Sequence, residues 1–264
     1  MKAISIVYHD VLHNIDPDSS GFPGAGPGRY KLDYEEFKEH LKAISCVQSA
    51  NRRSVMDFMK DGSELAYFLT FDDGGSSAAT VIADLLEKFG WIGHFFITTN
   101  RVNTPGFMTD AQIRELRNKG HVIGSHSASH PTRMSHCSWE ALCREWSDSV
   151  QALSDILQEP VFTASVPGGF YSRRVAESAD VAGIKALFTS EPVTRCHFVG
   201  DCLVLGRFKI MRGMPHDKSA RFFSPRSHAR VGQRMFWALK KTAKMLGGKQ
   251  YLKLRQELLK RNLV

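Results

Sequence analysis

Leu65-Ala66-Tyr67-Phe68-Leu69-Thr70-Phe71 is an apolar run almost without interruption, and Asp72-Asp73-Gly74 follows it directly. A short run that is apolar at successive positions is typical of a strand buried on both faces, as in a parallel sheet. Residues 65–71 are therefore predicted to form a central strand, with the two aspartates at its carboxyl end.

Strands and helices are predicted to alternate on both sides of this central strand. Further strands are expected at residues 3–8, 94–98, 121–125, 161–166, 186–189 and 202–210. Amphipathic helices are expected at residues 34–44, 81–89, 110–119 and 138–157. This alternation favours an α/β fold of parallel strands joined by right-handed crossovers. About seven strands suit a barrel, or a barrel with a gap.

Length and composition are those of an ordinary globular protein. The chain has 264 residues, enough for one large domain, and 42% of them are hydrophobic. It contains no apolar run of the roughly 18 residues that a membrane-spanning helix needs. The first eight residues are too short and too soon polar for a signal peptide. The cysteines are odd in number, scattered and without a Cys-x-x-Cys pair, so we expect reduced thiols and a cytoplasmic location.

The net charge of +8 is unevenly distributed along the chain. Residues 218–264 contain thirteen Lys and Arg against one acidic residue, a charge of +12, which leaves −4 on residues 1–217. We therefore predict a barrel domain over residues 1–217 and a basic helical tail over residues 218–264. Because the basic residues belong to the tail, the barrel domain is not expected to bind nucleic acid.

The tail has apolar residues at helical spacing between lysines and arginines, with a break at Gly247-Gly248. They are Met235, Phe236, Leu239, Ala243 and Leu246, and then Tyr251, Leu254, Leu258 and Leu259. In one interpretation these two helices pack on the outside of the barrel. In the other, they dock peripherally on an anionic membrane surface, at the inner face of the membrane.

Polar residues follow three of the predicted strands at their carboxyl ends. They are Asp72 and Asp73, then His126 and His130, then Pro167-Gly168-Gly169. The carboxyl ends of the strands of a parallel barrel lie on one face, and that face builds the active site. Two imidazoles and a carboxylate are suitable ligands for a divalent metal such as zinc, and three protein ligands leave a position open for water.

The two aspartates need not have the same role. One can bind the metal while the other takes a proton from the attacking water. The resulting hydroxide would attack an amide or ester carbonyl, and the backbone N–H of Gly168 is a candidate donor to the oxyanion.

These segments resemble the polysaccharide deacetylase family, carbohydrate esterase family 4, also called the NodB-homology domain. Residues 70–74, Thr-Phe-Asp-Asp-Gly, match its first motif, and residues 126–131, His-Ser-Ala-Ser-His-Pro, match its second. The opening Tyr8-His9-Asp10-Val11 is also similar to many bacterial members. The resemblance covers roughly residues 1–215 and implies a distorted (β/α) barrel. It also implies that Asp72 is the general base and that Asp73, His126 and His130 are the metal ligands.

Two departures from the family pattern concern catalysis. The third motif, Arg-x-Pro-x-Gly, here reads Ser165-Val166-Pro167-Gly168-Gly169, so the arginine that holds the catalytic base is replaced by Ser165. Pro167 and Gly169 match and are candidate substrate contacts. The family's late Leu-x-His motif, which supplies the general acid, is absent after Gly169, and Leu205-Gly206-Arg207 occupies a comparable late strand.

Two residues are candidates to compensate for these departures. Arg207 either orients Asp72 or stabilises the oxyanion, against the alternative that it is only a structural charge. His9, at the end of the first strand, is a candidate general acid or substrate contact, against the alternative of a core histidine. His197 and His216 are weaker candidates because they lie in predicted loops.

Three functions are compatible with the sequence. The first is metal-dependent removal of N- or O-acetyl groups from a glycan or sugar precursor, of the type associated with exopolysaccharide and cell-surface glycan synthesis. The second keeps the fold and metal but hydrolyses another C–N bond, such as a cyclic amide or a formyl group. The third is a decayed carbohydrate-binding or scaffold protein, suggested by the missing arginine and histidine.

Overall fold

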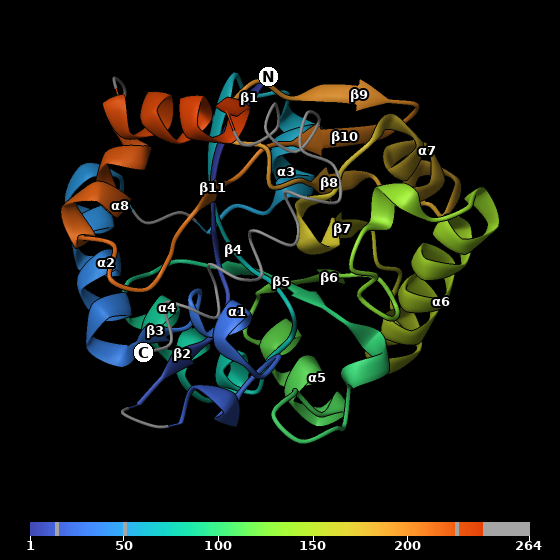
Figure 1. Cartoon of the computed structure of the whole chain (residues 1–264), viewed down its shortest axis with the longest axis horizontal. Coiled ribbons are helices and arrows are strands. Elements are labelled where there is room, and N and C mark those ends of the chain that lie inside the picture. Colours follow the sequence, from blue (N-terminus) through green and yellow to red (C-terminus); the bar gives the residue numbers. More distant parts are fainter. Residues whose placement is uncertain (14–15, 50–51, 225–226, 240–264) are drawn as a thin grey trace.

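The computed structural model describes residues 1–13, 16–49, 52–224 and 227–239 (Figure 1). Its main sheet has the strand order β11-β1-β4-β5-β6-β7-β8-β10-β9. All neighbouring strands in it are parallel except β9 and β10. The strands are β1 Lys2–Tyr8, β4 Leu65–Phe71, β5 Gly93–Ile97, β6 Val122–Ser125, β7 Thr163–Ser165, β8 Ala186–Phe188, β9 His197–Val199, β10 Cys202–Leu205 and β11 Phe208–Lys209.

The sheet curls because β10 and β11, which are adjacent in the chain, pair with strands towards opposite ends of the sheet. β10 pairs with β8 and β11 pairs with β1, yet only Gly206 and Arg207 separate them in the chain. The bent β10–β11 segment therefore leads from one side of the sheet to the other. Among the described residues the wall has seven parallel members: β1, β4, β5, β6, β7, β8 and this bent segment. The predicted distorted (β/α) barrel of about seven strands is confirmed.

Residues 202–210 were expected to form one strand, and this expectation is wrong. The strand is interrupted at Gly206, where an added Cβ would lie 2.4 Å from the carbonyl oxygens of Glu191 and Val193. Arg207 then turns its backbone N–H to the Glu191 carbonyl, at 2.9 Å. Close backbone approach at a glycine explains why the strand bends here.

Helices cover the outside of the sheet (Figure 1). They are α1 Ala25–Gly28, α2 Tyr34–Val47, α3 Val55–Asp61, α4 Ala83–Lys88, α5 Asp110–Asn118, α6 Trp139–Leu157, α7 Arg173–Val181 and α8 His216–Phe223. The helix expected at residues 81–89 begins earlier, as a π-helical turn over Ala78–Ile82. A capping box of Thr109 and Gln112 begins α5, in agreement with the helix expected at residues 110–119. A small second sheet pairs β2 Val11–Leu12 with β3 Leu32–Asp33.

The predicted boundary after residue 217 falls inside α8. This helix packs against α2, and its side chains at Ala220, Phe222 and Phe223 are buried in the same core as β1 and β4. Residues 228–239 are also helical. The Gln233 side chain in this segment bonds both the N–H and the C=O of Lys209, at 2.8 and 2.9 Å.

The apolar residues predicted for the tail are described only in part. Met235, Phe236 and Leu239 are exposed, at 63%, 58% and 69%. The remaining tail positions, from residue 240 onward, lie outside the described residues, and the predicted membrane contact falls mostly on them. In the described part of the chain, none of the helices combines the length and hydropathy needed to cross a bilayer.

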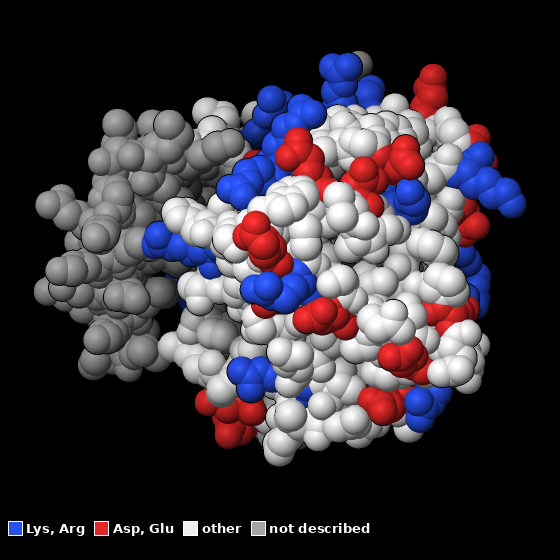
Figure 2. Space-filling view, turned by 90° about the vertical axis from the view of Figure 1, so that its right-hand side faces the viewer, with Lys and Arg blue, Asp and Glu red and all other residues white. Residues whose placement is uncertain are grey.

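The surface on the side of α6 and α7 carries acidic and basic side chains interspersed, without a large patch of one sign (Figure 2). Several of these charges form short-range ion pairs, such as Arg173 with Glu177 at 2.8 Å, one turn apart on α7. Exposed pairs of this kind contribute little to stability. This side is therefore an ordinary solvated exterior of the helical layer.

Candidate active site

Strand register places the first group of candidate residues side by side. Tyr8, the last residue of β1, is paired with Phe71, the last residue of β4. The next residues, His9 and Asp72, therefore leave the sheet at the same level and from adjacent strands. Asp73 follows immediately.

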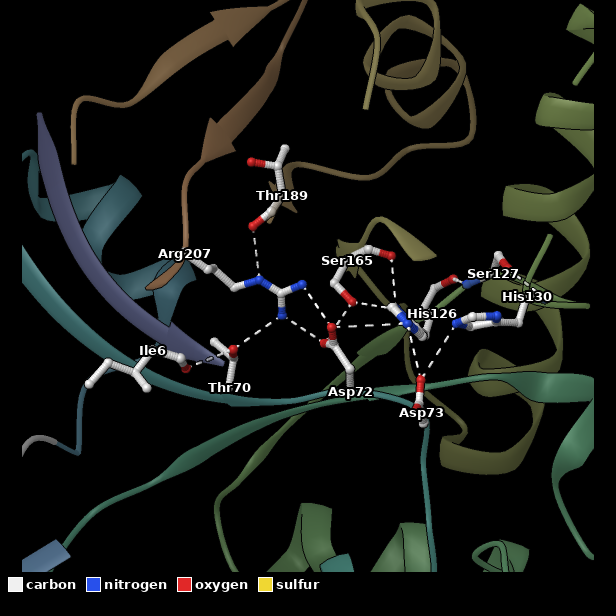
Figure 3. Close-up of polar contacts among 11 residues, drawn as sticks. Ile6, Thr70, Asp72, Asp73, His126, Ser127, His130, Ser165, Thr189 and Arg207 are labelled. Carbon is white, nitrogen blue, oxygen red and sulfur yellow. Dashed lines mark hydrogen bonds and ion pairs between the residues drawn. The ribbon is translucent and has the colours of Figure 1, made fainter. Parts of the chain in front are cut away.

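The second group leaves the sheet from β6 and β7. Ser125 at the end of β6 pairs with Ala164, so that His126 and Ser165 are also level with each other. The loop after β6 then brings His130 back towards His126, and the two imidazole centroids are 5.1 Å apart. Side chains from β4, β6 and β7 meet at one end of the barrel (Figure 3).

Asp73, His126 and His130 form a cluster that fits a divalent metal ion. One ligand atom from each lies within 4.8 Å of the others. The Oδ1 atom of Asp73 is 3.4 Å from His126 Nε2 and 3.6 Å from His130 Nε2. Tetrahedral coordination at about 2.0–2.1 Å requires ligand atoms roughly 3.3 Å apart, so these spacings need little adjustment. The side chain of His130 remains 25% exposed, which leaves one side of the cluster accessible.

Protonation states in the cluster also suit metal binding. Burial lowers the pKa of His130 to about 4, with a further contribution from His126, so its imidazole is neutral at neutral pH. Burial alone would raise the pKa of Asp73, but its contacts with His126, His9 and His130 lower that pKa below the usual value. A neutral imidazole and an ionised carboxylate are the forms that bind metal.

The loops that carry these ligands contain backbone strain. Asp73, Ser127 and His130 all have positive φ angles, 76°, 64° and 59°, in a region that side chains with a Cβ seldom adopt. Strain of this kind persists where the surrounding structure holds it, and it is common at functional sites. Here it turns the Asp73 and His130 side chains towards the same point.

Asp72 lies beside the metal cluster and is held by Arg207. The two terminal guanidinium nitrogens of Arg207 donate to the two carboxylate oxygens, Nη1 to Oδ1 at 2.6 Å and Nη2 to Oδ2 at 2.8 Å. Arg207 is fully buried, and its remaining donors bond the Thr189 carbonyl and the Thr70 hydroxyl. Burial alone would raise the pKa of Asp72, but the charge of Arg207 lowers that pKa well below the usual carboxyl value, so Asp72 is ionised.

Ser165 stands where the family motif has an arginine, and no role was predicted for it from the sequence. In the structure it connects the two halves of the site. Its Oγ donates to Asp72 Oδ1 at 3.0 Å and lies 2.5 Å from His126 Nδ1. A hydroxyl has one proton, and here it points to the carboxylate, so Oγ accepts from the Nδ1–H of His126. His126 therefore has its Nε2 lone pair free and directed at the metal cluster, 3.4 Å from Asp73.

This bridging position leads to a prediction for Ser165→Ala. The substitution removes the nearer of two acceptors at His126 Nδ1 and leaves the Ser165 carbonyl, at 3.1 Å. Loss of an outer partner typically weakens metal binding by roughly 10- to 100-fold, and the remaining carbonyl favours the lower end of that range. We expect that fall in Zn²⁺ affinity, measured by competition with a chromophoric chelator. Ser178→Ala is the matched control, because Ser178 is equally buried but bonds the Val175 carbonyl within α7. Equal affinities for wild type and Ser165→Ala would contradict the bridging role.

His9 and the loop after β7 complete the rim of the site. The His9 ring stacks on Tyr30 with centroids 4.9 Å apart, and its buried Nδ1 has no hydrogen-bond partner among the described residues. Burial raises the pKa of Asp72 and of Asp73, and the nearby His9 is one of the groups that lower both pKa values. Gly168, exposed with φ 61°, lies against the loop that follows His130, since an added Cβ would be 3.4 Å from the Thr132 carbonyl.

The two flanking residues, Pro167 and Gly169, lie on the same turn, Pro167 buried and Gly169 partly buried. The two weaker candidates lie elsewhere in the fold. His197 is on β9 and His216 begins α8.

Asp10 is a further buried carboxylate that the sequence did not single out. Its Oδ1 accepts hydrogen bonds from the hydroxyls of Ser20, at 2.6 Å, and Ser77, at 2.8 Å. It thereby ties the loop after β2 to the segment that follows Asp73. The same loop carries Phe22, whose ring packs 4.8 Å from the imidazole of His130. A signal for this role was the position of Asp10 two residues after the end of β1.

Comparison with known proteins agrees with this geometry. Residues 60–187 match the family model described as polysaccharide deacetylase. The chain is 30% identical over 137 residues to an uncharacterized 30.6 kDa protein of Geobacillus stearothermophilus, an alignment that spans 50% of this chain and 49% of that protein. It is 26% identical over 143 residues to the peptidoglycan-N-acetylmuramic acid deacetylase PdaA of Bacillus subtilis (50% and 49%). The chain thus spans about half the length of these curated relatives.

The fold is shared with solved deacetylase structures. The deacetylase PplD of Streptococcus pyogenes, determined in complex with acetate, superposes with a TM-score of 0.69 at 18% identity. That superposition covers 85% of this chain and 99% of the other. Similarity at this level of identity establishes the barrel architecture.

Proposed function

Because residues 60–187 belong to the polysaccharide deacetylase family, we propose that the chain hydrolyses acetyl groups on a sugar of a glycan. The observation that carries this proposal is the position of Asp72. It is an ionised carboxylate beside three metal-ligating side chains, and it is held in place by Arg207 rather than used as a ligand. A carboxylate in that position is suited to accept a proton from a water molecule.

The residues of the cluster suit a divalent ion, and we propose Zn²⁺ held by Asp73, His126 and His130. Such an ion, when bound, supplies a Lewis acid that acidifies water and polarises the acetyl carbonyl. In this scheme Asp72 takes the proton from the attacking water, and the backbone N–H of Gly168 is our candidate donor to the oxyanion. His9, partly exposed beside Asp72, is our candidate to protonate the leaving group.

Arg207 acts in this scheme on the base and not on the oxyanion. Both of its terminal nitrogens are engaged by Asp72, and its side chain is 0% exposed, so substrate does not reach it. We assign Arg207 as a positioning residue that fixes the orientation of the Asp72 carboxylate. Ser165 supports the same orientation from the other side.

For the substrate we propose an N-acetylhexosamine unit, with an O-acetyl sugar as the alternative. The family match supports an acetylated glycan, and the exposed side of His130 gives it access to the cluster. We further propose a role in making exopolysaccharide or another cell-surface glycan, as the divergent third motif suggests.

Acetate release tests the proposed reaction directly. The protein loaded with Zn²⁺ is expected to release acetate from N-acetylglucosamine oligomers, the chelated protein is expected to release none, and added Zn²⁺ is expected to restore the activity. Acetate is measured by an enzyme-coupled assay. Formate release from an N-formyl sugar, or ring opening of a cyclic amide, by protein that releases no acetate from the oligomers would favour hydrolysis of another C–N bond. Bound metal with no hydrolysis of any of these substrates would favour a binding protein.

A further inference from the structure

Phe22 packs on the proposed metal ligand His130 from a loop that precedes the segment matched by the family model. Its ring centroid lies 4.8 Å from that of the His130 imidazole, at an interplanar angle of 48°. Phe22 belongs to the loop between β2 and β3, whereas the family match begins at residue 60. The side chain of His130 is 25% exposed and that of His126 only 2%, so Phe22 lies at the more accessible side of the metal cluster.

His126 and His130 are oriented by different kinds of contact. The Nδ1–H of His126 donates to Ser165 Oγ. In the described parts of the chain, His130 forms a hydrogen bond to another residue only through its backbone N–H, which donates to Ser127 Oγ at 3.1 Å. Its imidazole packs against the Phe22 ring instead. An outer partner of a histidine ligand fixes the orientation of the ring, and an apolar partner also limits the access of water to the metal.

The ring of Phe22 is itself held by two side chains from the segment after β5. The Phe107 ring meets it edge to face, with centroids 5.1 Å apart. The guanidinium carbon of Arg101 lies 5.4 Å from the centroid of Phe22 and 5.9 Å from that of Phe107. Edge-to-face ring pairs and cations over aromatic faces are both attractive. These contacts favour the one orientation of Phe22 that packs on His130.

A buried hydrogen-bond network fixes the backbone of the loop that carries Phe22. Asp10 is 2% exposed, and its Oδ1 accepts from the hydroxyls of Ser20 and Ser77, at 2.6 and 2.8 Å. Ser20 Oγ accepts in turn from the Ser77 N–H, at 2.9 Å. The network therefore joins Ser20, two residues before Phe22, to the segment that follows Asp73.

Two glycines make room for the Asp10 carboxylate in this network. An added Cβ at Gly75 would collide with its Oδ1, and one at Gly21 would collide with its Oδ2. The N–H groups of Gly21 and Ser76 both donate to the Gly106 carbonyl, at 2.8 and 3.0 Å. The segments after β2, β4 and β5 are thus joined at one point, which sets the position of the Phe22 loop relative to the metal cluster.

We propose that Phe22 is a positioning residue for the metal ligand His130, and that the network of Asp10, Ser20 and Ser77 acts on the metal site through it. This inference rests on the proposed function for the identity of the ion, Zn²⁺, and not for the reaction. It makes the loop after β2 a part of the metal site, although this loop lies outside the family match.

The Zn²⁺ affinity of the full chain tests the role of Phe22 without turnover. Competition with a chromophoric chelator compares wild type, Phe22→Ala and Phe22→Tyr. Loss of an outer partner of a metal ligand weakens binding by roughly 10- to 100-fold, and we expect about tenfold for Phe22→Ala because the contact is apolar. Phe22→Tyr keeps a ring against the imidazole and is expected to keep wild-type affinity. Phe198→Ala, an exposed phenylalanine on β9, is the control.

A second series tests whether the network acts through Phe22. Ser20→Ala removes a hydroxyl that bonds both Asp10 and Ser77, and is expected to give a smaller loss of Zn²⁺ affinity in the same direction. When two residues act through one contact, their effects do not add, so Phe22→Ala/Ser20→Ala should bind Zn²⁺ as Phe22→Ala does. Ser178→Ala is the control for loss of a buried hydroxyl. Urea denaturation of each metal-free variant measures any change in stability separately.

The outcomes separate this proposal from the proposed function. Wild-type Zn²⁺ affinity in Phe22→Ala, or an equal loss in Phe198→Ala, overturns the positioning role. A greater loss in Phe22→Ala/Ser20→Ala than in Phe22→Ala shows that the network acts by another route and overturns that part. A wild-type protein that binds no Zn²⁺ also overturns the proposal. A tenfold loss in Phe22→Ala that Phe22→Tyr restores supports it even if no acetate is released, in which case only the deacetylase proposal fails.

Discussion

Replacement of Asp72 by asparagine is expected to reduce the kcat for acetate release by about 10²- to 10⁴-fold, the range for loss of a general base. The amide keeps the shape of the carboxylate but does not accept the proton of the attacking water. The proposed metal ligands are untouched, because Asp73 Oδ1, and not Asp72, lies 3.4–3.6 Å from both imidazole Nε2 atoms. The fall should therefore appear in kcat while the bound Zn²⁺, measured by elemental analysis, stays at the wild-type level.

Two results would contradict this role of Asp72. Wild-type kcat in Asp72→Asn would remove Asp72 from catalysis. Loss of zinc together with activity would show that Asp72 serves metal binding. Asp84→Asn is the matched control, since Asp84 is an exposed aspartate on α4 that pairs with Lys119 at 3.0 Å. It is expected to leave both kcat and zinc content unchanged.

The convergence of the metal cluster was predictable from sequence for a physical reason. Parallel strands fix the level at which each chain leaves the sheet, so the residues after β4 and β6 had to emerge at the same end. The motifs indicated which residues form the site, and the predicted strand ends indicated where in the fold these residues lie. The structure brings Asp73, His126 and His130 together where this reasoning placed them.

The partner of Asp72 was harder to choose from sequence. Arg207 stands 135 positions from Asp72, and sequence alone left two roles open for it, orientation of the base or stabilisation of the oxyanion. The choice between them depends on the bend at Gly206, which allows the side chain to run inside the barrel. Such a bend arises from tertiary packing, and the apolar pattern of residues 202–210 favoured an unbroken strand.

Smaller features were also beyond pattern reasoning. β9 was not predicted because only its last residue is buried and its length is three residues. The bridging role of Ser165 depends on register between β6 and β7, which no local motif encodes. The positive φ angles at Asp73 and His130 also depend on the assembled loops, although Asp and His adopt this region more often than most residues with a Cβ.

The third motif lacks its arginine, but the contact between an arginine and the base is kept, because Arg207 makes it from another strand. The family resemblance implies an arginine where Ser165 stands. Arg207, directly before β11, makes a bidentate pair with the Asp72 carboxylate. Ser165, at the position of the motif arginine, donates a further hydrogen bond to Asp72. A site whose base is held by two buried partners argues against a decayed protein.

Loss of Arg207 is expected to have the largest effect on stability. Arg207→Met leaves the Asp72 carboxylate buried without its charge partner, which typically costs about 3–5 kcal/mol in the free energy of unfolding. Acetate release is expected to fall as well, because the base is no longer oriented. Urea denaturation of the metal-free protein measures the first effect and steady-state kinetics the second. If Arg207→Met does not fold, Arg207→Lys keeps the charge but loses the bidentate geometry, and should retain fold with reduced kcat.

A double-mutant cycle with Asp72→Asn isolates the pair itself. If Arg207 acts through Asp72, the double variant Arg207→Met/Asp72→Asn loses less stability than the two single losses added together. Its kcat should also be no lower than that of Asp72→Asn, since orienting an absent base has no further effect. Arg173→Ala removes an exposed pair with Glu177, and a change of about 0.3–0.5 kcal/mol is expected there. Additive losses in the cycle, or wild-type acetate release by Arg207→Met, would show that Arg207 is a structural charge independent of the base.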